Sequence, residues 1–142
     1  MSESQIASDL QLAYRNTLFR VDGSPDPFTI RIGERSPEMD QLFDATGTRW
    51  ATLITAYNPY SHQASPGQNE FQNGRLAHIL TILSRKVVTA NGEVPDGDWP
   101  AEPSLLAVGL APADGRRLGA EFCQNAVVEF EIYKPARLAL LR

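Results

Sequence analysis

The alternation of hydrophobic and polar residues divides the chain into helices and strands. Apolar residues within 4–16 recur at helical spacing, so we expect an amphipathic helix there. Two short runs, residues 17–21 and 28–32, alternate as strands around a turn rich in glycine, proline and aspartate, which predicts a hairpin. A short helix over residues 36–47 follows, with serine and proline at its start and glycine at its end.

The centre of the chain predicts a buried strand followed by a long helix. Residues 50–57 are nearly free of charge and rich in aromatic, aliphatic and β-branched types, which is typical of a strand covered on both faces. Pro59 ends this strand because proline has no N–H for the ladder. Ser65 and Pro66 are typical of a helix start, so we expect a helix over about 66–85 with Ser65 as its cap. Residues 86–90 form the next strand, so we expect a βαβ unit with parallel strands.

The second half of the chain follows the same order. An irregular segment, residues 91–103, leads into a near-continuous apolar strand at 104–110. We expect a helix over 112–123 and then an alternating strand at 126–133. A turn leads into a last strand at 136–141, which closes a hairpin.

These elements predict an α/β (or α+β) fold in one domain. We expect a mixed sheet with two βαβ units, an N-terminal helix and hairpin, and a C-terminal antiparallel hairpin. A chain of 142 residues suits a single domain, here taken as 1–142. Within it, residues 1–49 hold the first helix, hairpin and short helix, residues 50–130 form the core, and residues 131–142 supply the closing strand.

The helix over 66–85 places amide side chains on its buried side. On a helical wheel, Asn69, Gln72 and Asn73 share the stripe of Leu76, whereas His78 points to solvent. Buried amides need partners, because an unpaired buried polar group costs about 1–3 kcal/mol. Two interpretations are open: the amides bind the backbone of the preceding loop and fix it, or they line a polar pocket where the strand ends and the helix begins.

Composition and charge narrow the classes of function. A net charge of −4 with scattered basic residues argues against a nucleic-acid partner. A single cysteine excludes an intramolecular disulfide and a cysteine-based zinc site. The N-terminus has no basic and apolar regions of a signal peptide, and no apolar run is long enough to cross a bilayer. We therefore expect a cytoplasmic protein without a membrane partner.

Motifs that carry known chemistry are missing from the sequence. Neither a dinucleotide-binding glycine pattern nor a phosphate-binding loop is present, so no cofactor is predicted. His62 and His78 are not at metal-ligand spacing. Asp96, Asp98 and Glu102 match no calcium loop, so we predict no metal site and read them as a solvated acidic loop.

Four blocks of residues, in this order and spacing, resemble a bacterial family, the domain of unknown function 3293. The blocks are residues 50–60 with Thr55-Ala56-Tyr57-Asn58-Pro59, then Asn69 and Asn73, then Trp99 with 102–104, and finally 122–127. The likeness covers about residues 50–130. The resemblance implies a basic residue at the position of Gln72 and a glycine at that of Cys123, and this chain departs from both. The family has no assigned activity, so the resemblance implies no reaction.

Polar side chains follow strand ends and helix starts throughout this region. Either they meet in one ligand-binding pocket or each fixes its own turn. Amides recognise hydrogen-bonding patterns but carry protons poorly, which favours binding over catalysis. The candidate ligand-binding residues are Tyr57, Asn58, Ser61, Asn69, Gln72, Asn73, Glu102, Ser104, Gln124 and Asn125.

The sequence therefore leaves three functions open, and it does not predict the oligomeric state. The first is a domain that binds a small polar or nucleotide-like molecule in an amide-rich pocket at the end of the central strand. The second is an enzyme, a hydrolase or transferase, with Glu102 as acid and base and Tyr57 or His62 assisting. The third is an interaction or regulatory module without a pocket, with Phe71 and Trp99 as exposed anchors.

Overall fold

The computed structural model describes residues 4, 6–23, 26–94 and 101–142. In these parts of the chain one seven-stranded sheet carries four α-helices and a short 3-10 helix, η1. The strands are β1 (Leu18–Val21), β2 (Phe28–Ile30), β3 (Trp50–Ile54), β4 (Lys86–Glu93), β5 (Glu102–Val108), β6 (Ala126–Glu131) and β7 (Arg137–Leu140). The helices are α1 (Ser8–Asn16), α2 (Pro37–Thr46), η1 (Pro59–Ser61), α3 (Pro66–Leu83) and α4 (Pro112–Glu121).

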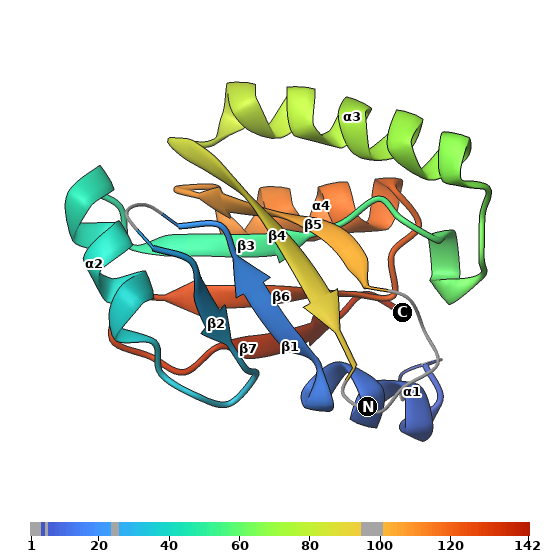
Figure 1. Cartoon of the computed structure of the whole chain (residues 1–142), viewed down its shortest axis with the longest axis horizontal. Helices are drawn as coiled ribbons and strands as arrows, with labels where there is room; N and C mark the ends of the chain where they lie inside the picture. The colour runs from blue at the N-terminus through green and yellow to red at the C-terminus, as the bar shows by residue number, and fades with distance from the viewer. Residues whose placement is uncertain (1–3, 5, 24–25, 95–100) are drawn as a thin grey trace.

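The strand order is β2-β1-β4-β5-β3-β6-β7, and every pairing among the described strands is antiparallel. Helix α3 connects β3 to β4, but β5 lies between those two strands (Figure 1). Helix α4 likewise connects β5 to β6, and β3 lies between them. The segment from β3 to β6 therefore consists of two interleaved split βαβ units, the β-α-β-β-α-β order of ferredoxin-like folds.

The single domain, both βαβ connections and both hairpins agree with the sequence-based fold, but the described strands form a wholly antiparallel sheet instead of the predicted mixed one. Each pair of strands joined by a helix does run in the same direction, with an antiparallel strand inserted between them. A strand covered on both faces is apolar whatever the direction of its neighbours, so the composition of 50–57 could not settle the pairing. Residues 91–103, predicted to be irregular, extend β4 to Glu93 and begin β5 at Glu102, which pair as a hairpin.

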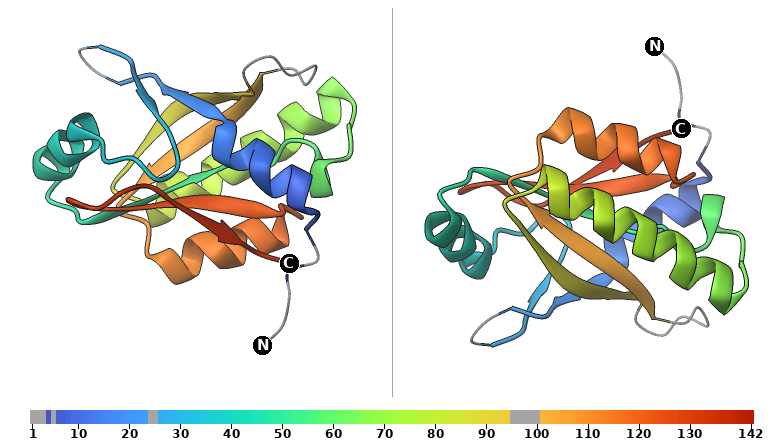
Figure 2. Two further views of the ribbon diagram at one scale, coloured as in Figure 1. Left: turned by 90° about the horizontal axis from the view of Figure 1, so that it is seen from below. Right: turned by 90° about the horizontal axis from the view of Figure 1, so that it is seen from above.

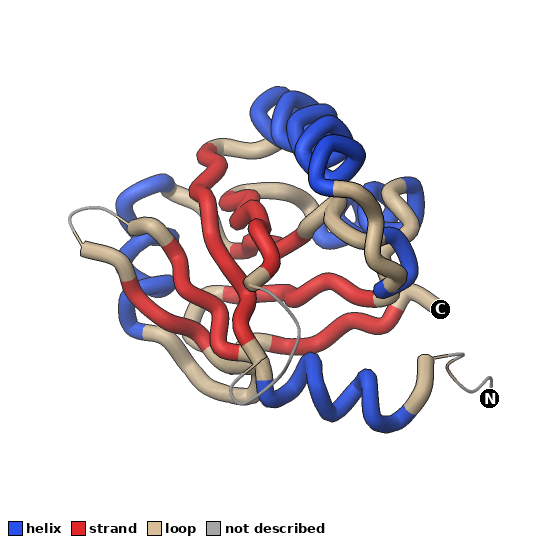
Figure 3. The backbone as a smooth tube through the Cα atoms, turned by 45° about the vertical axis from the view of Figure 1, so that its right-hand side comes forward, coloured by secondary structure: helices blue, strands red, loops and turns tan. Residues whose placement is uncertain are grey.

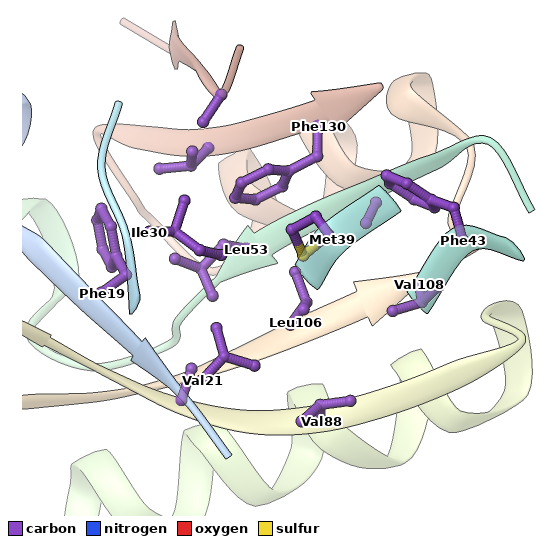
Figure 4. Close-up of a cluster of buried hydrophobic side chains, with 14 residues drawn as sticks. Phe19, Val21, Ile30, Met39, Phe43, Leu53, Val88, Leu106, Val108 and Phe130 are labelled. Atoms are coloured by element: carbon purple, nitrogen blue, oxygen red, sulfur yellow. The ribbon is translucent and has the colours of Figure 1, made fainter. Parts of the chain in front are cut away.

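Helices cover both faces of the curled sheet. Helices α3 and α4 lie side by side on one face, as the view from above shows, and α1 and α2 lie on the other (Figure 2). Figure 3 shows the curl of the sheet. Leu76 of α3 and Leu118 of α4 belong to the apolar core of the first face. In the core of the second face, Met39 and Phe43 of α2 pack near Leu106 (Figure 4).

Local sequence explains where the central helix begins. The Ser65 side chain accepts a hydrogen bond from Gln68 N, and the Gln68 side chain accepts one from Ser65 N, which makes the predicted N-terminal cap a full capping box. As the wheel predicts, Leu76 and Asn69 are buried and His78 is exposed. No helix in the described part of the chain has the length and hydrophobicity to cross a membrane.

Candidate functional site

A cavity of about 310 Å³ lies between α1 and the sheet, on the face opposite α3. Helix α1 forms its roof with Leu10, Ala13 and Tyr14. The floor and walls are mainly apolar and come from the strands. The remaining apolar lining residues are Phe19, Leu53, Ile54, Gly92, Val94, Ala126, Val127, Val128 and Leu138.

One end of the cavity is polar, and three separate segments build it. They are the loop after β3, the start of β5 and the turn between α4 and β6. The antiparallel insertion of β3 between β5 and β6 brings these segments to the same edge of the sheet. Besides Tyr14 and Thr17 near the roof, the polar lining residues are Thr55, Asn58, Ser61, Glu102, Ser104 and Gln124.

Asn58 is the centre of the hydrogen bonds at this end. Its Nδ2 donates to Oε2 of Glu102 at 3.1 Å, and its Oδ1 accepts from Ala64 N at 3.1 Å. Asn69 binds it twice, because Asn69 Nδ2 donates to Asn58 Oδ1 and Asn58 N donates to Asn69 Oδ1, both at 2.9 Å. The backbone N–H of Ala64 must face an oxygen, which fixes the amide orientation and turns the Asn58 donor toward Glu102.

The loop after β3 adopts an unusual backbone conformation. Asn58, Tyr60 and Ser61 have φ values of 48°, 53° and 62°, in the left-handed region that non-glycine residues rarely occupy. Such residues cost about 1–3 kcal/mol each and persist where the surroundings fix them. Tyr60 N donates to Cys123 O at 2.6 Å, and Cys123 has a φ of 58°. The glycine implied by the resemblance at that position suits this conformation.

Other predicted amides hold the backbone of this loop. Asn73 Oδ1 accepts from Ala56 N at 3.1 Å, and Gln124 Nε2 donates to Tyr57 O at 3.1 Å. The Gln72 amide instead accepts from the exposed Arg75 side chain at 2.8 Å. For Asn69, Asn73 and Gln124 the hydrogen bonds thus support the loop-fixing interpretation.

A chain of polar contacts connects the roof to the loop and to the C-terminus. Tyr14 OH lies 3.2 Å from Ser61 Oγ, which accepts from Asn125 Nδ2 at 3.0 Å. Asn125 Oδ1 accepts from Arg142 Nη1 at 3.1 Å, and the Arg142 guanidinium lies 4.1 Å from the centre of the Tyr60 ring. A hydrogen bond with the Cys123 side chain raises the pKa of the Tyr60 phenol, and Arg142 opposes this shift.

The cavity brings together half of the predicted ligand-binding residues. Those among its described lining residues are Asn58, Ser61, Glu102, Ser104 and Gln124. Those outside that lining are Tyr57, Asn69, Gln72, Asn73 and Asn125. Ligand binding by any of the ten stays a prediction.

The candidate catalytic residues do not gather in the cavity. Glu102 lines it and is half-buried, whereas Tyr57 and His62 are not among the described lining residues. His62 is exposed just after η1. Of the acidic loop, Asp96 and Asp98 lie outside the described residues, as does Trp99.

Sequence reasoning missed the roof and the apolar walls. The signal for the roof was present in the amphipathic pattern of the first helix, whose apolar residues Leu10, Ala13 and Tyr14 line the cavity. The pattern shows that these residues face the protein. It cannot show that they stand away from the sheet and leave space beneath them.

Comparison with known proteins identifies the family. The fold is a ferredoxin-like core with an extended, curled sheet, and the site is a roofed cavity with a polar end. The model of the family described as Protein of unknown function (DUF3293) matches residues 54–127, about half of the chain, and the chain belongs to that family. This confirms the resemblance drawn from residues 50–130.

A curated relative has a name that describes an activity. The aspartate/glutamate leucyltransferase of Rhizobium meliloti (strain 1021) is 35% identical over 83 residues. The alignment covers 54% of this chain and 29% of the relative, so the chain spans less than a third of that protein. No solved structure matches the chain.

Proposed function

We propose that this chain is a small-ligand-binding domain whose ligand occupies the cavity beneath α1. The observation that carries the proposal is the cavity itself, of about 310 Å³, with five independently predicted polar residues at one end. Concave, mainly apolar cavities with a few convergent polar groups are the usual form of ligand sites. The volume is near the lower end of the range of about 300–1,000 Å³ for such sites, which favours a small molecule.

The composition of the walls refines the ligand expected from the sequence. A wholly polar molecule would leave its hydrogen-bonding groups unpaired against Leu53, Val128 and Leu138. A molecule with an apolar body and one polar end matches both parts of the cavity. The five polar residues then select the polar end, while the loop-fixing amides hold them in place.

Transfer chemistry is the second candidate, because the relative is named as a leucyltransferase. A leucyl group has an aliphatic side chain that suits apolar walls, and Glu102 lines the same cavity. The position of Tyr57 and His62 outside the described lining removes the helpers that an acid–base mechanism would use. Binding without chemistry therefore fits the arrangement better.

A partner-binding surface is the third candidate. Phe71 on α3 is 65% exposed, as that hypothesis expects. The hypothesis also expected no cavity, and a cavity is present. The exposed surface of α3 thus supports partner binding less than the cavity supports ligand binding.

Filling the cavity tests the proposal. Ala13→Phe places a ring beneath the roof, and Ala45→Phe places the same ring on the exposed surface of α2 as the matched control. A library of small amphipathic metabolites is screened by thermal shift against the three proteins. Compounds that bind the cavity raise the melting temperature of the unmodified protein and of Ala45→Phe but not of Ala13→Phe. Equal shifts in all three proteins, or no shift with any compound, would contradict cavity binding.

A further inference from the structure

We propose that the polar end of the ligand is an ammonium group. This inference rests on the proposed function, because it names the class of molecule that the cavity beneath α1 would hold. The molecule has a protonated amine attached to a small aliphatic body. Glu102 and Gln124 recognise the amine, and the apolar walls hold the body.

The charge of the lining points to a cation. Glu102 is the one charged side chain among the described lining residues, and no arginine or lysine is among them. Asn58 Nδ2 donates to Oε2 of Glu102 and orients the carboxylate at the polar end. A carboxylate in a mainly apolar cavity attracts a cation more strongly than it would in water and repels an anion.

The orientation of Gln124 supplies a second acceptor. Gln124 Nε2 donates to two backbone carbonyls, Tyr57 O at 3.1 Å and Phe122 O at 3.3 Å. Because carbonyls can only accept, the nitrogen must face them, and Oε1 must point away. No described residue donates to Oε1, although Gln124 is only 7% exposed and lines the cavity. A ligand donor at this end would satisfy it.

The remaining polar lining groups agree with a donor in the ligand. Ser104 Oγ donates to Glu102 O at a long 3.3 Å, so the oxygen of this buried hydroxyl can also accept. An ammonium has three donors and no acceptor, which matches a set of acceptors. A carboxylate or phosphate would bring only acceptors. The Arg142 guanidinium contacts Asn125 and Tyr60 and is not among the described lining residues.

Three molecules with the same branched body separate the possibilities. They are 3-methylbutylamine, 3-methylbutan-1-ol and 4-methylpentanoate, which carry a cationic, a neutral and an anionic end. Each is titrated into the full chain, and methyl NMR signals of Val128 and Leu53 report occupation of the cavity. We expect the amine to bind about tenfold more tightly than the alcohol, a typical effect of one charge-assisted hydrogen bond, and the carboxylate to bind least.

A charge-neutral variant tests the residue. Glu102→Gln keeps an oxygen that can accept from Asn58 Nδ2 but removes the charge. Glu121→Gln removes a carboxylate from the exposed end of α4, outside the described lining, and is the matched control. We expect Glu102→Gln to lose the preference for the amine, about tenfold, with the affinity for the alcohol unchanged, and Glu121→Gln to behave like the unmodified protein.

The outcomes distinguish this inference from the proposed function. Equal affinities for amine and alcohol overturn the ammonium inference while cavity binding stands. Failure of all three molecules also overturns it, and the metabolite screen with Ala13→Phe then decides the proposed function separately. The comparison of the three molecules on the unmodified protein needs no variant, so the inference stays testable even where Glu102→Gln does not fold.

Discussion

Helices α4 and α1 pack on opposite faces of the sheet in different ways. On one face α4 approaches so closely that a Cβ built at Gly115 would lie 2.7 Å from Thr52 Oγ1, and one at Gly119 would lie 2.6 Å from Leu141 Cδ1. On the other face no residue of α1 is buried, and a cavity separates that helix from the strands. The sheet is therefore closely packed beneath α4, whereas beneath α1 a cavity lies beside the core that α2 covers.

This difference shows how one small fold can combine a closely packed helix with a cavity. Close helix-to-sheet packing removes apolar surface from water at about 25 cal/mol per Å², and it needs small residues where backbones meet. A helix that roofs a cavity, as α1 does, buries less apolar surface and is stabilised less. The proposed binding site thus lies beneath the helix that contributes no buried side chain to the core.

The largest effect is expected from disturbing the closely packed face. Gly115→Val forces two methyl groups against Thr52, a fully buried and stiff β-branched residue, so we expect a loss of about 2–3 kcal/mol. Gly74→Val on α3 is the control, because nothing lies within 4 Å of a Cβ there. Urea denaturation measures both variants. If Gly115→Val unfolds at the same urea concentration as Gly74→Val, α4 does not pack against Thr52 as closely as described.

An intermediate effect is expected from the amides that hold the loop after β3. Asn69→Ala removes the acceptor of the Asn58 backbone N–H and one of the two donors to Asn58 Oδ1, at a cost of about 1–3 kcal/mol. Gln72→Ala removes an amide that accepts a hydrogen bond from exposed Arg75, and we expect a change within about 0.5 kcal/mol. Thermal unfolding measures the difference. Equal stabilities would contradict the role of Asn69 in fixing the loop.

The smallest effect concerns an ion pair on the closely packed face. Hydrogen bonds from Arg116 lower the pKa of the buried Glu129 carboxylate, burial opposes this, and Arg137 adds to the lowering. Because this pKa is lower in the folded protein, the carboxylate stabilises the folded state at pH values above the ordinary glutamate pKa of 4.5. That contribution is lost as the pH falls through the lowered pKa. Both arginines are more than half exposed, so screening by water keeps the effect modest.

The test is the pH dependence of the urea midpoint between pH 7 and pH 3. We expect the unmodified protein to lose more stability below about pH 4.5 than Glu129→Gln does, because other carboxylates titrate in both proteins and cancel in the comparison. Parallel pH profiles for the two proteins would mean that Glu129 does not stabilise the fold through its charge.

Much of the fold could be predicted because local signals set its elements. The capping box at Ser65 and the alternating run at β6 each determine their element without help from distant residues. The direction of pairing could not be predicted, because it depends on β5 entering between β3 and β4, and apolar strands pair in either direction. Long-range insertion of this kind leaves no local pattern.

The polar end of the candidate site was accessible to sequence reasoning for a similar reason. Asn58, Glu102 and Gln124 stand at strand ends and turns, where polar residues must have a local purpose. Which of these residues face the cavity and which hold a backbone depends on single rotamers. Asn58 does both, while Asn69 one helical turn into α3 does only the second among its described contacts.

The family match, residues 54–127, does not include the roof of the cavity. It contains the loop, the carboxylate and the glutamine, whereas Leu10, Ala13 and Tyr14 precede it and Leu138 follows it. Under the proposed function, the residues that recognise the polar end of the ligand thus lie in the shared part of the chain, whereas the roof of the cavity lies outside it. A different first helix would thus change the size of the cavity without altering the chemistry at its polar end.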